Sequence, residues 1–439
     1  MKYILCTALL LTIIFSFGQP HILNQRAQAT LVDELLDDRL KNTLPKLMRR
    51  EGIDMWIIIS REYNEDPIIK TFLPATWMAA RRTTILVMFD RGPDKELELL
   101  AVSRYDVGQR LKRAWDPDHQ PNQWTQLGKI IDERNPKKIG INKSEHVGHA
   151  DGLTANDYEQ FLKAVSKKHH PAITSSEKLA VSWLETRSER EMIIYQQICR
   201  IAHEIIAEGF SDRVIQPGVT TTEDVVWWYR ERIKELKLDT WFHPSVSIQR
   251  NEPDAIFTKR IQPVVILPGD LLHVDFGITY LRLNTDTQQH AYVLKSDEHD
   301  APDFLKKAFA RGNKLQDILT RNFVQGKTGN QILAESRKQA IDQGLSPSIY
   351  THPIGYHGHA AGTTIGMWDM QGGVPHNGDY PLHYNTAYSI ELNVTVYLIE
   401  WKKEIQIKLE EDGFFSEAGF RYIDGRQTEL MLIPKKSKP

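Results

Sequence analysis

A carboxylate stands inside an apolar run at residues 269–277, which read Gly-Asp-Leu-Leu-His-Val-Asp-Phe-Gly. Alternate residues of a strand face opposite sides, so Val274 and Phe276 point one way and Asp275 the other. A buried carboxylate costs free energy unless it is paired or binds a cation. Asp286 follows eleven positions later, and the two arms of a hairpin would bring both carboxylates to a hard cation. The alternative is a satisfied buried aspartate followed by an aspartate in a turn.

Histidine and glutamate residues further along the chain favour the cation site. Residues 351–359, Thr-His-Pro-Ile-Gly-Tyr-His-Gly-His, contain three histidines, Glu391 lies in a β-like apolar run, and Glu410 ends an alternating strand. The order Asp, Asp, His, Glu, Glu supplies four carboxylates and one imidazole. This set suits two oxygen-preferring divalent ions that share bridging carboxylates, and it does not suit a thiolate-rich structural zinc site.

The order and spacing of these residues resemble the pita-bread metallopeptidases, a family that includes aminopeptidase P, prolidase, methionine aminopeptidase and the metal-free creatinase. The family pattern is an apolar strand with Asp-x-Gly, an Asp eleven positions on, His-x-x-Gly with a second His seven after the first, then two Glu residues. The resemblance spans the C-terminal half of the chain. The matching residues here are Asp275, Asp286, His352, His359, Glu391 and Glu410.

The resemblance implies a metal-binding role for five of these residues. Asp275 would chelate one metal ion, and Asp286 and Glu410 would bridge both ions. His352 and Glu391 would complete the second site. We expect two divalent ions, manganese in the first place, with zinc or cobalt as alternatives. Retention of all five ligands argues against the creatinase branch, which replaces them.

The choice of the ligand histidine is open in the sequence. His359 also begins a His-x-x-Gly run, and His357 lies between the two candidates. We prefer His352 because it alone is followed by another histidine seven positions later. His359 would then face the substrate.

The expected chemistry follows from these ligands. Two divalent ions about 3.5–4 Å apart can share a water and make it hydroxide-like near neutral pH. Glu391 can accept the proton of that water, and His359 can stabilise the tetrahedral intermediate. The resemblance further implies cleavage before proline, where the bond lacks an N–H, by an Xaa-Pro aminopeptidase or Xaa-Pro dipeptidase. The alternatives are a non-catalytic pita-bread protein that binds a peptide or a partner, and a hydrolase of a non-peptide amide or ester.

Three positions depart from the family pattern. The substrate-side histidine that usually lies 17 residues before the first Asp is Thr258 here. The usual Asp-x-Thr-Arg-Thr is Asp-Thr-Gln-Gln-His at residues 286–290, and the usual Arg two residues before the last Glu is Lys408. These departures bear on substrate preference and leave the five inferred ligands intact.

Residues 1–18 are typical of a signal peptide, with a lysine at position 2, an apolar run over 3–17 and Gly18-Gln19 for cleavage. The apolar run is shorter than the roughly 20 residues of a membrane span. Cleavage after Ala27-Gln28-Ala29 and an uncleaved anchor are the alternatives. We expect an exported protein, periplasmic or secreted, without membrane attachment once the signal is removed. Cys199 is then the one remaining cysteine, which excludes a disulfide within the mature chain.

The remaining length of about 420 residues favours two domains. We expect an α/β (α+β) fold, with a creatinase-like N-terminal domain at 19–185 and a pita-bread catalytic domain at 186–439. Residues 39–51 are expected to form a helix, and Thr220-x-x-Glu223 predicts a capping box. The net charge of −2 gives no reason to expect nucleic acid or an anionic membrane as partner. The resemblance implies a peptide substrate with proline and a homo-oligomer.

Overall fold

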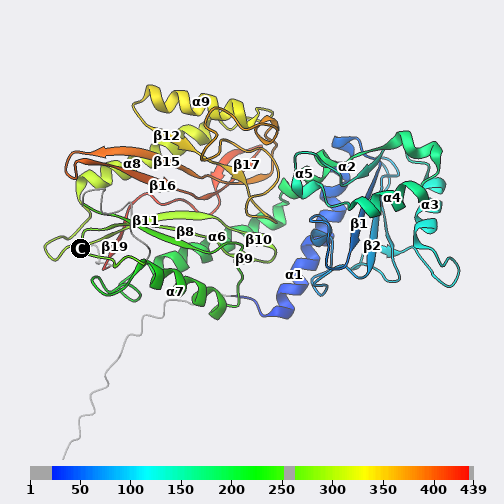
Figure 1. Ribbon diagram of the computed structural model, residues 1–439, viewed down its shortest axis with the longest axis horizontal. Helices are drawn as coiled ribbons and strands as arrows, with labels where there is room; N and C mark the ends of the chain where they lie inside the picture. The colour runs from blue at the N-terminus through cyan, green and yellow to red at the C-terminus, as the bar shows by residue number, and fades with distance from the viewer. Residues whose placement is uncertain (1–21, 252–262, 435–439) are drawn as a thin grey trace, which may run out of the picture.

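The computed structural model describes residues 22–251 and 263–434. The predicted signal peptide and Thr258 lie outside these residues. Figure 1 shows the chain as two halves side by side, the N-terminal half in blue to green-cyan and the C-terminal half in green to red. Within the described ranges, no helix combines the length and the apolar character that crossing a membrane requires.

The N-terminal half is built on a six-stranded sheet in the order β4-β3-β2-β1-β5-β6. Its central strand β1 (Met55–Arg61) pairs antiparallel with β2 and parallel with β5. Residues 55–60 are all buried, which explains why this strand is a continuous apolar run. The other strands are β2 (Thr83–Phe89), β3 (Glu98–Val102), β4 (Lys112–Arg113), β5 (Ile139–Ile141) and β6 (Ile173–Ser175).

Helices cover this sheet and lead into the C-terminal half (Figure 1). The expected helix at 39–51 begins earlier, at Gln25, and a π-helical turn at Arg39–Thr43 interrupts it. It ends as expected before Gly52, which has a φ of 65°, a conformation that glycine adopts without steric cost. The helices are α1 (Gln25–Asp38), α2 (Leu44–Glu51), α3 (Gln123–Arg134), α4 (Ala155–Ala164) and α5 (Glu177–Glu185).

The C-terminal half begins with helix α6 (Glu189–Gly209), which Ser188 and Glu191 cap in a capping box. The capping box predicted at Thr220 and Glu223 was wrong by one residue, because Thr221 and Asp224 cap helix α7 (Thr222–Glu235). The Thr220 hydroxyl is not free for that role, since it accepts a hydrogen bond from the backbone N–H of Gln216. The remaining helices of this half are α8 (Asp303–Arg321) and α9 (Gly329–Asp342).

The strands of the C-terminal half form three main sheets that enclose its centre, with α8 and α9 on one side and α6 and α7 on the other (Figure 1). One sheet has the order β19-β11-β8-β7, with β7 (Ser245–Gln249), β8 (Leu271–Phe276), β11 (Thr287–Val293) and β19 (Met431–Ile433). The second has the order β12-β15-β16, with β12 (Pro347–Ile349), β15 (Leu392–Leu398) and β16 (Lys403–Leu409). The third has the order β13-β14-β17-β18, with β13 (His352–Pro353), β14 (Thr386–Ser389), β17 (Asp412–Ser416) and β18 (Gly419–Tyr422).

Two features connect these layers around the centre. A small hairpin of β9 (Thr279–Tyr280) and β10 (Leu283–Asn284) joins β8 to β11. An antiparallel bridge between Gln288 and Glu410 then ties β11 to the end of β16. The centre of the C-terminal half is therefore a place where the ends of several strands meet.

Candidate metal centre

The six residues singled out in the sequence all lie near strand ends at this centre. Asp275 is the fifth residue of β8, and Asp286 immediately precedes β11. The hairpin expected between them is present, and Asp275 lies opposite Gln288 in the antiparallel register. Four residues come from the other sheets, and they are His352 at the start of β13, His359 in the loop after it, Glu391 between β14 and β15, and Glu410 between β16 and β17.

The fold brings these side chains into three overlapping groups. Members of each group can place one ligand atom each within 4.8 Å of one another. The first group joins the two aspartates to Glu410, and the second joins His352 to Glu391 and Glu410. The third joins Asp286, His352 and His359. Among the described residues, His357 belongs to none of these three groups.

Two buried atoms of the cluster have no hydrogen-bond partner among the described residues. They are Oδ1 of Asp286 and Nε2 of His352. The His352 Nε2 atom lies 3.7 Å from Asp286 Oδ2 and 3.7 Å from Glu410 Oε1, which is too long for hydrogen bonds. Unsatisfied polar atoms at such depth are rare in folded proteins and indicate a missing partner.

The electrostatics of the cluster lead to the same conclusion. Burial, and then the charge of Glu410, raise the pKa of Asp275 to about 8, while Lys408 opposes the rise. The same two causes raise the pKa of Asp286 and of Glu391 well above the usual range. Buried carboxylates that repel one another in this way are relieved by a cation. The residues present therefore fit divalent metal ions, which prefer carboxylate and imidazole ligands.

A model of metallopeptidase family M24 matches residues 194–417, which is more than half of the chain. The chain belongs to metallopeptidase family M24. The matched range contains all six of the residues above, and the resemblance to pita-bread metallopeptidases is thereby confirmed. Membership assigns the chain to the metallopeptidases. No curated protein matches the chain significantly.

Solved structures confirm the fold of this M24 chain. It is similar to an X-Pro aminopeptidase from Thermotoga maritima, with 16% identity, a TM-score of 0.61 and coverage of 88% of this chain and 99% of the other. An Xaa-Pro dipeptidase from Bacillus anthracis has 17% identity, a TM-score of 0.53 and coverage of 93% and 100%. A histidine-to-alanine variant of Escherichia coli aminopeptidase P has 11% identity, a TM-score of 0.56 and coverage of 92% and 95%. The expected fold class, a mixed α/β N-terminal domain followed by a pita-bread domain, is confirmed.

Aromatic rings hold His359 at the edge of the M24 cluster. Its ring centroid lies 5.1 Å from that of Trp241 and 4.8 Å from that of His352. Tyr350 packs at 5.8 Å. The backbone of Gly358 leaves room for Trp241, because a Cβ at this glycine would lie 2.2 Å from the indole. Burial, and then His352, lower the pKa of His359.

The N-terminal half reaches the same loop, which the sequence did not indicate. His149, in the short helical turn Gly148–Ala150, packs against His357 with ring centroids 4.4 Å apart. Tyr356 packs against the apolar core of the N-terminal half. No motif in the sequence around His149 could have identified this contact, because it joins positions more than 200 residues apart.

Gln288 is a site residue whose role the sequence analysis missed. In the sequence it is only a departure from the family pattern, yet its amide nitrogen donates hydrogen bonds to both Glu391 and Glu410. A signal was available, since Gln288 is two positions after Asp286 and alternate strand residues share a face.

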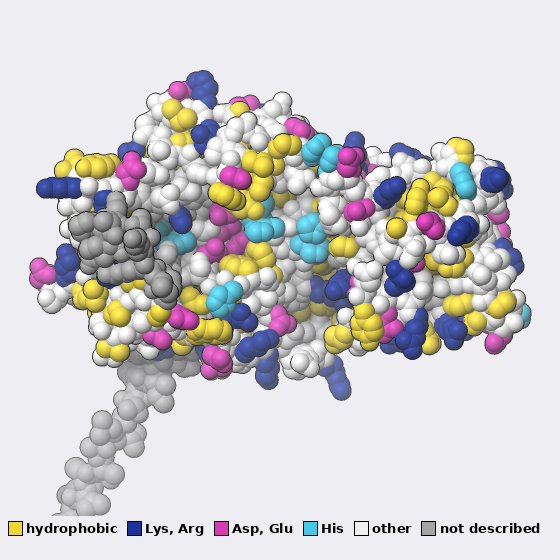
Figure 2. Space-filling view, viewed as in Figure 1, with side chains coloured by type: hydrophobic (Ala, Val, Ile, Leu, Met, Phe, Trp, Pro, Cys, Tyr) yellow, Lys and Arg dark blue, Asp and Glu magenta, His cyan; other side chains and the backbone are white. Residues whose placement is uncertain are grey.

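A cavity of about 720 Å³ opens beside the cluster. Its lining includes Asp275, Glu391 and Lys408, together with hydroxyl and amide side chains of β7, β15 and β16. Figure 2 shows acidic and histidine side chains gathered where the C-terminal half is hollowed. The volume is in the range of small-molecule and peptide sites.

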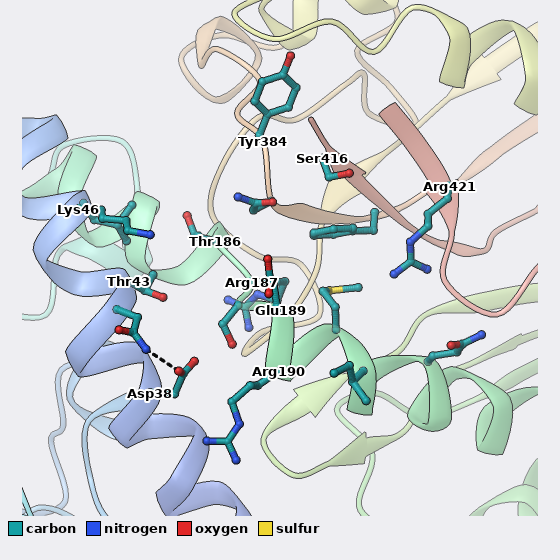
Figure 3. A pocket seen from close by; sticks show the side chains of 18 of the residues that line it. Asp38, Thr43, Lys46, Thr186, Arg187, Glu189, Arg190, Tyr384, Ser416 and Arg421 are labelled. Atoms are coloured by element: carbon teal, nitrogen blue, oxygen red, sulfur yellow. Dashed lines mark hydrogen bonds between the residues drawn. The ribbon is translucent and has the colours of Figure 1, made fainter. Parts of the chain in front are cut away.

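A separate cleft of about 860 Å³ lies between the two halves, and none of the six residues lines it. Figure 3 shows Lys46 on its N-terminal side and Arg421 on its C-terminal side, with Arg187 and Glu189 between them. The cluster of carboxylates and histidines, and not this cleft, carries the chemistry expected of an M24 member.

Proposed function

We propose that the protein is a metallopeptidase that hydrolyses the bond before proline, as an Xaa-Pro aminopeptidase or an Xaa-Pro dipeptidase. The observation that carries the proposal is the set of three overlapping ligand groups, in which Asp286, His352 and Glu410 each occur twice. Shared ligands of this kind suit two neighbouring ions better than one. The similar structures named as X-Pro aminopeptidase and Xaa-Pro dipeptidase support the choice of substrate.

Five residues would hold the two ions, which are proposed to be manganese, and they are Asp275, Asp286, His352, Glu391 and Glu410. Bound divalent ions supply a Lewis acid for the substrate carbonyl and lower the pKa of water. Glu391 accepts the proton of the attacking water, since it lies both in the cluster and on the wall of the cavity. His359 donates a hydrogen bond to the oxygen that gains charge on the substrate. Trp241 and Tyr350 keep the His359 ring in place for that role.

The test is hydrolysis of Xaa-Pro and Xaa-Pro-Yaa peptides by the manganese-loaded protein, with Asp286→Ala as the control. Cleavage that the variant loses supports the proposal, and the favoured peptide length separates aminopeptidase from dipeptidase. Two bound ions without cleavage of any proline peptide would exclude the proposed substrate. A hydrolase of non-peptide amides or a peptide-binding protein would then be the next hypothesis.

We also propose that the protein is exported and assembles as a homo-oligomer. The charged start and apolar run of residues 1–18 support export. The proposal of a homo-oligomer is supported by the family resemblance alone. The mass of the mature chain recovered from cell fractions tests the first proposal, and light scattering tests the second.

A further inference from the structure

Gln288 occupies a fixed place at the metal cluster. It lies opposite Asp275 in the register of β8 and β11. Its backbone N–H donates to the carbonyl of Glu410 at 3.0 Å, and its carbonyl accepts from the backbone N–H of Glu410 at 3.2 Å. The residue is 5% exposed. Because the backbone is held on two sides, the reach of this side chain is set by the fold.

The amide of Gln288 joins two of the proposed ligands. Its Nε2 atom donates to Glu391 Oε1 at 2.9 Å and to Glu410 Oε2 at 2.7 Å. An amide nitrogen carries two hydrogens, so one side chain can satisfy two separate carboxylates. The threonine of the family pattern has a single hydroxyl hydrogen and can donate to only one.

A second layer of side chains fixes the orientation of the amide. Carboxylate oxygens accept hydrogen bonds, so the NH₂ group of Gln288 faces Glu391 and Glu410, and its carbonyl Oε1 faces away. That oxygen lies 2.8 Å from His273 Nε2, which therefore carries the imidazole hydrogen. The other ring nitrogen, Nδ1, is free to accept from the Ser247 hydroxyl at 3.3 Å. Ser247, His273 and Gln288 form a chain of hydrogen bonds that ends at the cluster.

We propose that Gln288 is a positioning residue of the metal centre, and that His273 and Ser247 hold its amide in the orientation that two glutamates need. The inference rests on the proposed metal centre and deepens it. The neutral amide keeps Glu391 and Glu410 at a fixed separation without adding a charge that would compete with a cation. Loss of such a partner typically weakens metal affinity by about 10- to 100-fold.

The neighbouring glutamine supplies a matched control. Gln289 is also buried, and its amide nitrogen donates to Glu411 at 2.9 Å and not to a proposed ligand. Gln288→Leu and Gln289→Leu thus remove the same group from adjacent positions on opposite faces of β11. A general loss of packing affects both variants, whereas a positioning role affects only the first.

The experiment is a calorimetric titration of the metal-free full chain with manganese, for the wild type and both variants. Gln288→Leu is expected to weaken binding about 10- to 100-fold, and Gln289→Leu to leave it near the wild-type value. If Gln288→Leu does not fold, Gln288→Thr replaces it. We expect the manganese affinity of Gln288→Thr to lie between that of the wild type and that expected for Gln288→Leu, because one hydrogen-bond donor remains.

Cobalt provides a readout that a merely structural role would not change. The visible absorption of the cobalt-loaded chain reports ligand geometry, so it is expected to shift in Gln288→Leu or Gln288→Thr and not in Gln289→Leu. Wild-type affinity and an unshifted spectrum in the Gln288 variants would overturn the positioning role and leave the metal centre standing. A wild-type chain that binds neither manganese nor cobalt would overturn both proposals.

Discussion

Arg39 and Glu191 join the two halves of the chain through a buried hydrogen bond of 2.7 Å between Nη1 and Oε2. The side chains are 0% and 1% exposed. Arg39 comes from the π-helical turn after α1, and Glu191 is a capping residue of α6. Arg187 pairs with the same glutamate at 3.2 Å and lies against the ring of Tyr356. Tyr356 belongs to the loop after β13 that also carries His357 and His359. The N-terminal half is therefore in contact with the segment that carries His359.

Arg39→Met is expected to lower the free energy of unfolding by about 1–3 kcal/mol, the usual cost of leaving buried hydrogen-bond acceptors unpaired, because Glu191 keeps its ion pair with Arg187. The backbone carbonyls of Trp183 and Thr186 lose their donor as well. Urea unfolding measures the change. Arg49→Met is the control, since its pair with Asp90 is partly exposed and its loss should cost less than about 1 kcal/mol. Equal losses in the two variants would contradict the role of the Arg39 pair.

Glu185 predicts a pH dependence of stability. Both of its carboxylate oxygens are buried without a hydrogen-bond partner among the described residues. Burial, opposed by Arg50, raises the pKa of this side chain to about 8. The pKa of a glutamate in the unfolded chain is about 4.3. Because the pKa of Glu185 is higher in the folded protein, protonation of this side chain stabilises the fold. The stability it contributes is complete below that unfolded value and is lost as the pH rises through about 8.

Glu185→Gln removes this titration. We expect the variant to be more stable than wild type at pH 8.5 by a few kcal/mol and unchanged near pH 4.5, since a rise in pKa from about 4.3 to about 8 corresponds to at most about 5 kcal/mol above pH 8. Thermal unfolding across this range measures the difference. Glu145→Gln, at an exposed position, is the control and should leave the profile as in wild type. A constant difference at all pH values would assign the effect to packing and not to ionisation.

The metal cluster predicts opposite effects on the metal-free and metal-loaded protein. Asp286 is buried and is repelled by the nearby charge of Glu410. Asp286→Asn removes this carboxylate and with it the repulsion. The metal-free variant is therefore expected to unfold at a higher temperature than the metal-free wild type. Manganese at about 100 times its dissociation constant should stabilise wild type by about 2.7 kcal/mol and the variant by much less. A variant that is less stable than wild type without metal would contradict the repulsion.

Gly358 predicts a defect in turnover. A Cβ at this position would lie 2.2–2.3 Å from three atoms of the Trp241 indole, so Gly358→Ala must displace the ring that packs on His359. We expect turnover to fall at least about tenfold, since small misplacements of catalytic groups have large effects, while manganese affinity stays near wild type.

Gly372→Ala is the control for this prediction, because a Cβ there meets no atom within 4 Å. The double variant Gly358→Ala with Trp241→Leu makes room for the methyl group and is expected to relieve the clash. It also removes the ring that supports His359, so only thermal stability should recover. Recovery of turnover in the double variant would show that Trp241 has no part in placing His359.

The sequence by itself determined the ordered set of acidic residues and histidines and the family to which the chain belongs. Asp275 and Asp286 could be recognised because strand alternation and hairpin spacing are local properties of the chain. The same local reasoning located the end of the helix expected at 39–51, just before Gly52. Where it failed by one residue, at Thr220 and Thr221, two adjacent threonines offered the same hydroxyl, and a turn had already engaged one of them.

The tertiary structure alone decided which distant groups meet. Arg39 and Glu191 lie 152 positions apart, and His149 and His357 come from different halves, so no local pattern links either pair. Gln288 could be placed on the face of Asp286 by alternation, but its two acceptors belong to other strands. Their meeting depends on the bridge between β11 and the end of β16. The physical reason is that long-range packing alone fixes how the sheets approach one another, and local sequence patterns carry no information about it.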